Sequence, residues 1–388
     1  MPQTESAKPT HQITTSHESF APPPAAHLGW QALLEAHRLL EIDDARTAWH
    51  PDGFTWRAHR LAQRFRFEGP VEIDGVPTWW VDVDTACLRG ADPGSDRVLA
   101  WVVAQNAANR LGALVLEGDR VRLRARVAVR PESLTGRVRL LAEWATVANL
   151  FAHGQAQALE EGLAATLASP GLEFDAGNGR SGADGDQLRD ALVRVYARAA
   201  GAVAPDRLHD LGGVVQVGLT HGGWVSSDRE AGWVRIRFAW GLQGLRETPF
   251  GGVVFREFTD NPPVVELWAE GGPRHPLLGA GTLVRLVVPA PAGVSLEEGV
   301  RWANCWNLAE LGAPLAMSSL GAWGWRPAAS GLGDAWVWGA FFPDATAYPK
   351  LPGLEVKEAI ARAHWFVGGP GRALRPGGGA GHEPIGAP

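Results

Sequence analysis

Arginines recur at every second position in two segments of the chain, with apolar residues between them. They are Arg120, Arg122, Arg124 and Arg126 in the first segment, and Arg235 and Arg237 in the second. A β-strand sends successive side chains to opposite faces, so each segment predicts a strand with guanidinium groups on one face.

Guanidinium groups pair well with carboxylates and phosphates. Five of these arginines are therefore our candidates for binding an acidic partner: Arg122, Arg124, Arg126, Arg235 and Arg237. The plainer interpretation, which we weight more heavily, is a sheet with one solvated face. Arginines combined with tryptophans also fit single-stranded nucleic acid. The net charge of −6 argues against that partner.

Tryptophan is unusually frequent, with 18 residues against 2 tyrosines. An indole supplies a large apolar surface and one N–H donor, which suits both cores and interfaces. We expect most of them to be core residues, because eleven lie from Trp224 onward and several hold matching places in two parts of the chain. Four are candidates for facing a partner: Trp79 or Trp80, and Trp323 with Trp325.

No residue pattern predicts a catalytic, cofactor or metal site. HExxH and G-x-S-x-G are absent. The one enzymatic alternative requires His50, His59 and Asp82 to converge, with Asp84 as a further neighbour. We therefore expect a non-enzymatic protein with no catalytic residues, no cofactor and no metal.

The two cysteines, Cys87 and Cys305, exclude a disulfide framework. Cys305 lies in an apolar helical stretch and is expected to be a core thiol. The start of the sequence lacks the apolar segment of a secretory signal. No apolar run reaches the roughly 20 residues of a membrane helix. The expected compartment is the cytoplasm.

Composition, together with stretches rich in glycine and proline, divides the chain into five parts. We predict a disordered arm over 1–26, a domain over 27–168, a Gly-rich linker over 169–186, a second domain over 187–367 and a disordered tail over 368–388. The linker contains Gly177-Asn-Gly-Arg-Ser-Gly182, which matches G-x-G-x-x-G but lacks the buried strand that a dinucleotide site needs before it.

Periodicity predicts the elements of the two domains. In the first, we expect a helix over 28–45, strands over 54–67 and 77–83, a helix over 98–110, a hairpin over 114–129 and a helix over 132–167. In the second, helices are predicted over 187–202, 300–311 and 354–366, the second of them opened by a Ser295–Glu298 capping box. Strands are predicted over 214–219, 233–240, 253–258, 264–268, 283–288, 322–325 and 335–342. The fold class is therefore α+β.

The order helix, two strands, helix occurs twice, which indicates an internal repeat. Asn106 and Asn109 lie in the first central helix, and Asn304 and Asn307 in the second. Asparagine is a weak helix former, so we expect these side chains to hold the neighbouring hairpin or a helix end.

The run from Gly293 to Asn307, with its Asn304-Cys-Trp-Asn307 motif, resembles the central helix of YbjN-type proteins. Asn106-Ala-Ala-Asn109 followed by the hairpin is similar, although it lacks the tryptophan between the asparagines. The YbjN group in turn resembles type III secretion chaperones. The resemblance covers about 70 residues in each half. It implies two α+β domains, each an antiparallel sheet flanked by helices, in a protein that binds other proteins.

On these grounds we expect a protein-binding adaptor or chaperone-like regulator. Its two domains would form a pseudo-dimer within a monomeric chain. The alternatives are a nucleic-acid-associated accessory protein in stress or repair, and an enzyme with an unfamiliar site.

Overall fold

The computed structural model describes most of the first half of the chain and separate stretches of the second. The described residues are 27–57, 61–73, 75–109, 112–163 and 166–167, which we call the first half. Those of the second half are 191, 193, 224–230, 233–239, 245–247, 253–255, 264–275, 279–290, 293–312, 320–327, 334–343 and 362. Over 224–275 the backbone alone is described. The predicted arm, linker and tail lie outside these residues, as do strand 214–219 and nearly all of helices 187–202 and 354–366.

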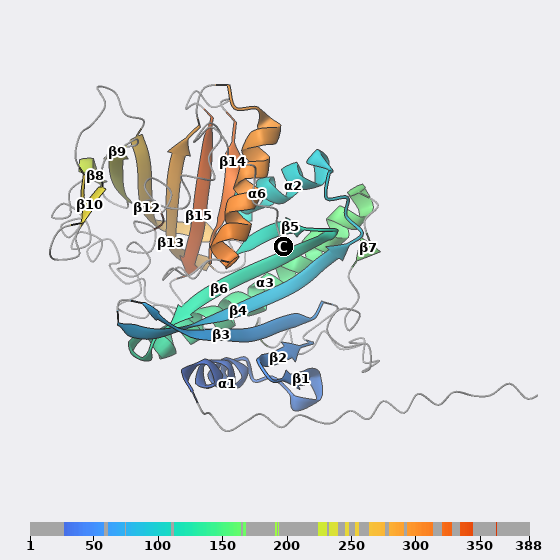
Figure 1. Ribbon diagram of the computed structural model, residues 1–388. Coiled ribbons are helices and arrows are strands. Elements are labelled where there is room, and N and C mark those ends of the chain that lie inside the picture. Colours follow the sequence, from blue (N-terminus) through green and yellow to red (C-terminus); the bar gives the residue numbers. More distant parts are fainter. Residues whose placement is uncertain are drawn as a thin grey trace, which may run out of the picture.

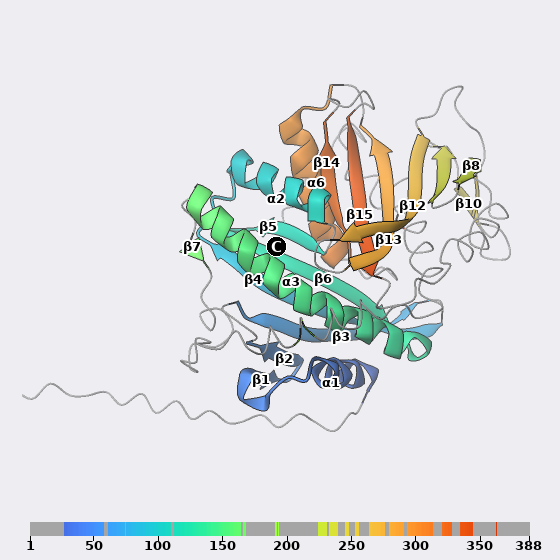
Figure 2. The same cartoon turned by 180° about the vertical axis from the view of Figure 1, so that it is seen from behind.

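The first half is an antiparallel sheet with helices. Its elements are α1 (Leu28–Leu40), β1 (Thr47–His50), β2 (Gly53–Trp56), β3 (Gln63–Ile73), β4 (Val76–Arg89), α2 (Asp96–Asn109), β5 (Ala113–Glu117), β6 (Arg120–Val129), α3 (Leu134–Leu163) and β7 (Thr166–Leu167), with short 3-10 turns at Asp44–Arg46 and Pro131–Ser133. The strand order is β1-β2-β3-β4-β6-β5, and β7 pairs with β4. Helix α3 lies along one face of this sheet, as the two opposite views show (Figures 1 and 2).

The second half contains a six-stranded antiparallel sheet. Its elements are β8 (Trp224–Glu230), β9 (Trp233–Ala239), β10 (Leu245–Glu247), β11 (Val253–Phe255), β12 (Val264–His275), β13 (Gly279–Pro289), α6 (Leu296–Gly312), β14 (Ala322–Arg326) and β15 (Ala335–Pro343). The strand order is β8-β9-β12-β13-β15-β14, while β10 and β11 form a separate hairpin. The fold is therefore α+β with antiparallel sheets.

The two six-strand paths share one topology. In each, four strands run in chain order, a helix follows, and the next two strands return so that the later one pairs with the fourth strand. Strand β5 corresponds to β14, β6 to β15 and β4 to β13. The second half differs by the additional β10–β11 hairpin between its second and third strands.

Local sequence signals explain the helix starts. The amide of Glu298 donates to Ser295 Oγ (3.2 Å) and the amide of Ser295 to the Glu298 carboxylate (3.0 Å), which confirms the capping box. At α2 the cap is Ser95, whose Oγ accepts from the amide of Val98 (3.4 Å). Asp96 is the first helical residue there.

Several predicted elements have different limits. The predicted helix 132–167 ends at Leu163, and residues 166–167 form β7. The predicted helix 28–45 ends at Leu40, because Glu41 adopts a left-handed conformation (φ 51°) and its amide bonds the carbonyl of Arg38. The predicted strand 54–67 is two strands, β2 and β3, which pair with each other. The hairpin of β5 and β6 agrees with its prediction.

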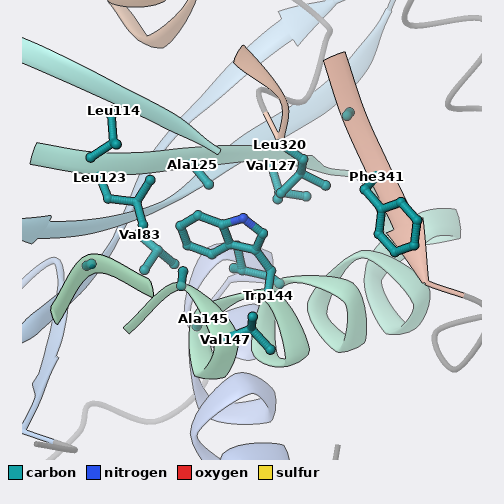
Figure 3. Packing of buried hydrophobic residues seen from close by; sticks show 14 of the residues in the cluster. Val83, Leu114, Leu123, Ala125, Val127, Trp144, Ala145, Val147, Leu320 and Phe341 are labelled. Atoms are coloured by element: carbon teal, nitrogen blue, oxygen red, sulfur yellow. The ribbon is translucent and has the colours of Figure 1, made fainter. Parts of the chain in front are cut away.

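One cluster of buried apolar side chains runs through both halves. Trp144 of α3 lies against Ala125 and Val127 of the first sheet, and Leu320 and Phe341 of the second half lie beside them (Figure 3). The absence of a side chain at Gly112 lets the Trp144 ring lie close to the backbone there, since a Cβ would be 2.5 Å from the ring. The two halves therefore share one core.

Candidate functional site

The predicted face with arginine side chains is present in the structure. It also carries aspartates, so positive and negative side chains alternate from strand to strand. Register places Arg66, Asp82 and Arg126 in one row across β3, β4 and β6. The next row is Arg64, Asp84 and Arg124. Direct cross-strand neighbours share a face, so both rows lie on the face opposite the apolar side chains that meet α3. We call the seven side chains Arg64, Arg66, Asp82, Asp84, Arg122, Arg124 and Arg126 the charged face.

Carboxylates neutralise the arginines of β6. Arg122 Nε donates to Asp84 Oδ1 (3.1 Å), and Arg124 Nε lies 3.9 Å from the other oxygen of Asp84. Glu117 of β5 lies within 4 Å of both arginines. These guanidinium groups are therefore not an unneutralised cationic stripe, which weakens the sequence-based case for nucleic acid.

Arg126 is the most deeply buried arginine of the charged face, with 5% of its side chain exposed. Its Nη2 donates to Glu68 (2.7 Å), its Nε lies 3.6 Å from Asp82 Oδ1, and its Cζ lies 5.0 Å from the centre of the Trp80 ring. Its Nη1 donates to the carbonyl oxygen of Leu311 at the end of α6 (2.5 Å). The last carbonyls of a helix lack partners within the helix, so Arg126 caps α6 from the other half of the chain.

Asp82 lies between Arg66 and Arg126. Arg66 Nε donates to Asp82 Oδ2 (3.2 Å). Burial raises the pKa of Asp82 above its ordinary value, against the opposing effect of Arg126, Arg66 and Arg124. The guanidinium groups therefore counteract only part of the effect of burial on the pKa of this carboxyl group.

The enzymatic arrangement of His50 with Asp82 is wrong. The two residues lie in one row, but β2 and β3 separate their strands, so they are about 14 Å apart. His50 Nε2 instead contacts Thr55 Oγ1 (3.0 Å). His59 lies outside the described residues. Within those residues, no three His, Cys, Asp or Glu side chains gather as a metal would require.

Three of the four tryptophans expected to face a partner are core residues. Trp80 is 1% exposed, Trp323 0% and Trp325 7%. Trp325 packs against Trp336, and Trp323 against Trp306 (ring centres 5.2 Å apart in both pairs). Trp79 is half-buried and stacks on His27 at the start of α1. The expected surface position is wrong for Trp323 and Trp325, because β14 packs against both α2 and α6. Of the alternatives Trp79 and Trp80, Trp80 is the core residue.

Arg235 and Arg237 lie in β9, an interior strand of the second sheet. Register places Arg235 opposite Asp228 of β8 and Arg237 opposite Glu266 of β12. Their side chains lie outside the description, so their binding role remains a prediction.

The asparagines in the central helices contact strand edges, as expected. Asn106 bonds the amide and the carbonyl of Leu114 in β5 (both 2.8 Å). Asn307 bonds the same two groups of Trp323 in β14 (2.7 and 3.0 Å). The structural counterpart of Asn106 is therefore Asn307, three residues from the correspondence that the sequence motif gives. The side chain of Asn109 is not described.

Asn304 bonds across the two halves. It accepts from the amide of Leu116 in β5 (3.0 Å) and donates to its carbonyl (3.1 Å). The amide of Gly112 also donates to the carbonyl of Leu320 (2.8 Å), and Arg301 pairs with Asp96 (2.8 Å). With Arg126 and Leu311, these contacts form what we call the seam between the halves.

Sequence reasoning missed the acidic half of the charged face. In the sequence, Asp82 and Asp84 enter only the enzymatic alternative, and nothing there singles out Arg64 and Arg66. The signal was present, because both pairs have the same two-residue spacing as Arg122 and Arg124. Only the pairing of β3, β4 and β6 shows that these residues share one face with the arginines of β6.

Two further findings complete the description. Cys305 is exposed, contrary to the expected core thiol, whereas Cys87 is buried. Every helix within the described stretches is too short or too polar to cross a bilayer. No protein-family model, curated protein or solved structure matches the chain.

Proposed function

We propose that this protein is a non-enzymatic, cytoplasmic adaptor or chaperone-like regulator that binds another protein, and that its two halves act as a pseudo-dimer in one chain. The observation that carries the proposal is the shared topology of the two sheets, joined through the seam. Symmetric dimers are the commonest oligomers, and two copies of one topology in a single chain can take the place of two identical subunits.

The contacts at the seam support this interpretation. Helix α2 packs on β14, where a Cβ at Gly324 would lie 2.7 Å from Cβ of Ala107. Conversely, the central helix of the second half packs on the first sheet, where Leu308 and Leu311 of α6 contact Ala113 and Val115 of β5. Each half thus places its central helix on the edge strand of the other, as two subunits of a dimer would.

The partner surface that we propose consists of the exposed part of the charged face, which is Arg66, and of Glu68 and Glu117 beside that face. Arg66 is its most exposed arginine, with 42% of the side chain exposed, and Glu68 and Glu117 are 65% and 46% exposed. Exposed carboxylates contribute little as ion-pair partners, so an acidic segment of another protein can replace them at low cost.

The experiment is affinity capture from a native lysate with the full chain as bait. One protein should be retained at a stoichiometric level, and Arg66→Ala should reduce its retention at least threefold. The matched control is Arg38→Ala, which removes a 69% exposed arginine from α1. Failure to retain a stoichiometric partner, or equal retention by both variants, would contradict the proposal.

A further inference from the structure

Two arginines of the charged face contact two carboxylates that differ in their exposure to solvent. Asp82 is buried, and each of its oxygens faces one arginine: Arg66 Nε lies 3.2 Å from Oδ2 and Arg126 Nε lies 3.6 Å from Oδ1. Glu68 is mostly exposed, and its Oε2 accepts from Arg126 Nη2 (2.7 Å). The first carboxylate is fixed within the sheet, whereas the second lies where a group from solution can replace it.

The guanidinium group of Arg66 has donors that the fold does not use. Within the part of the chain that the structure describes, its one hydrogen bond joins Nε to Asp82. Both Nη groups are therefore open, and the side chain is exposed. The planar fork of a guanidinium group can bind both oxygens of a carboxylate. Because Arg66 and Arg126 contact the same aspartate, their guanidinium groups lie close enough to bind one further ligand together.

The ligand that suits this pair is a carboxylate. The contact of Glu68 shows that Arg126 Nη2 accepts such a group at this place. With Asp82 ionised, the two guanidinium groups and that aspartate carry one net positive charge, which one carboxylate balances. A phosphate dianion would exceed this charge and would be repelled by Asp82 behind the two arginines.

Glu68 occupies this position from within the chain. It follows Arg66 by two residues in β3, so both side chains leave the strand on the same side. An exposed ion pair stabilises a protein only slightly, so a carboxylate from solution can displace Glu68 from Arg126. The other side of Arg126 stays fixed, because its Nη1 donates to the carbonyl oxygen of Leu311 in α6.

We propose that Arg66 and Arg126 form a binding site for an aspartate or glutamate side chain of another protein, and that Glu68 regulates this site as an internal competitor. This inference rests on the proposed function, because it names the chemical group of the partner and the residue that limits its binding. On binding, the carboxylate of the partner replaces Glu68 at Arg126 Nη2 and also accepts from the open Nη groups of Arg66.

The test removes the competitor and keeps both arginines. The probe is a fluorescein-labelled hexaglutamate peptide, and its affinity for the full chain is measured by fluorescence anisotropy. Glu68→Gln should bind the peptide at least threefold more tightly than the unmodified chain. Arg66→Ala, added to Glu68→Gln, should abolish this gain.

Glu72→Gln is the matched control. It removes the same charge from an exposed position of the same strand, opposite Pro77 and beyond the irregularity that follows Glu68. Within the described residues Glu72 takes part in no ion pair, so its replacement should change the affinity by less than 1.5-fold, about 0.2 kcal/mol. Equal affinities of the two glutamine variants, no binding by Glu68→Gln, or a gain that survives Arg66→Ala would overturn the inference.

Competition at constant ionic strength tests the choice of ligand. Inorganic phosphate should displace the peptide no better than acetate does, and stronger displacement by phosphate would overturn the assignment to carboxylates. The outcome is separable from that of the proposed function. A partner captured from a lysate, together with equal affinities of Glu68→Gln and Glu72→Gln, would overturn the role of Glu68 and leave the proposed function standing. The expected peptide affinities without any captured partner would contradict the proposed function and leave the carboxylate site standing.

Discussion

Gly299 shows at the scale of one residue how the tryptophans of the second half are accommodated. A Cβ at this position of α6 would lie 2.4 Å from the ring of Trp325. The carbonyl of Gly299 also accepts from Trp336 Nε1 (2.8 Å). The absence of a side chain therefore lets two indoles reach the helix backbone, which explains a glycine in a helix interior despite its poor propensity.

Gly299→Ala should lower the free energy of unfolding by about 1–3 kcal/mol, because the added methyl group overpacks the Trp325 ring. Urea denaturation followed by tryptophan fluorescence measures the change. Gly312→Ala, in the same helix with open space around its Cα, is the control and should change stability by less than about 0.5 kcal/mol. Equal effects would contradict this account.

His37 predicts a dependence of stability on pH. His37 is in the last turn of α1, and its Nε2 lies 2.9 Å from Oγ1 of Thr47 in β1. Burial lowers the pKa of His37 below the ordinary value of 6.5, and Asp44 opposes this shift. The unfolded chain then binds the proton more readily, so this contribution to stability is complete above pH 6.5. It declines below that value and is lost as the pH falls through the lower pKa of the folded state. Urea titrations at pH 7.5 and 5.5 should show a larger loss for the unmodified chain than for His37→Gln. The same loss in both would refute the assignment.

At the scale of elements, interactions between opposite charges on the charged face link β3, β4 and β6. Its arginines lie on β3 and β6, and its aspartates lie on β4 between them. Each aspartate therefore has guanidinium groups on the strands at both sides, which offset part of the free energy that burial of a carboxylate costs. Arg126 extends these interactions to α6 through the carbonyl of Leu311.

Arg126→Gln should lower the free energy of unfolding by about 3–5 kcal/mol, because it leaves Asp82 with fewer cationic neighbours in a buried place. Arg120→Gln is the control on the same strand, where 44% of the side chain is exposed. It should change stability by less than about 0.5 kcal/mol. Calorimetric unfolding of both variants distinguishes the two positions, and a small effect at Arg126 would contradict its role at the seam.

At the scale of the whole molecule, the shared core joins the halves that the sequence predicts as separate domains. Trp144 of the first half and Phe341 of the second belong to one buried cluster. The seam adds hydrogen bonds between α6 and the first sheet. The two sheets should therefore lose their structure together.

We expect the full chain to unfold in one transition. Most tryptophans lie in the second half, so fluorescence reports mainly on that half, whereas far-ultraviolet circular dichroism reports on both. The two signals should give the same urea midpoint. Midpoints more than about 0.5 M apart would show two independent units and contradict the shared core.

The sequence by itself determined the fold class, the β5–β6 hairpin, the start of α6 and the role of the asparagines as contacts to nearby backbone. These features depend on residues close together in the chain, where alternation, caps and turns act directly. The tertiary structure alone decided that Arg122, Arg124 and Arg126 meet Asp82, Asp84, Glu68 and Glu117, and that Trp323 and Trp325 are covered. It also decided that Asn304 reaches a strand of the other half. The physical reason is that alternation along a strand decides only which side chains share a face. The ion-pair partners of those side chains, and the residues that pack on the face, come from strands and helices remote in sequence.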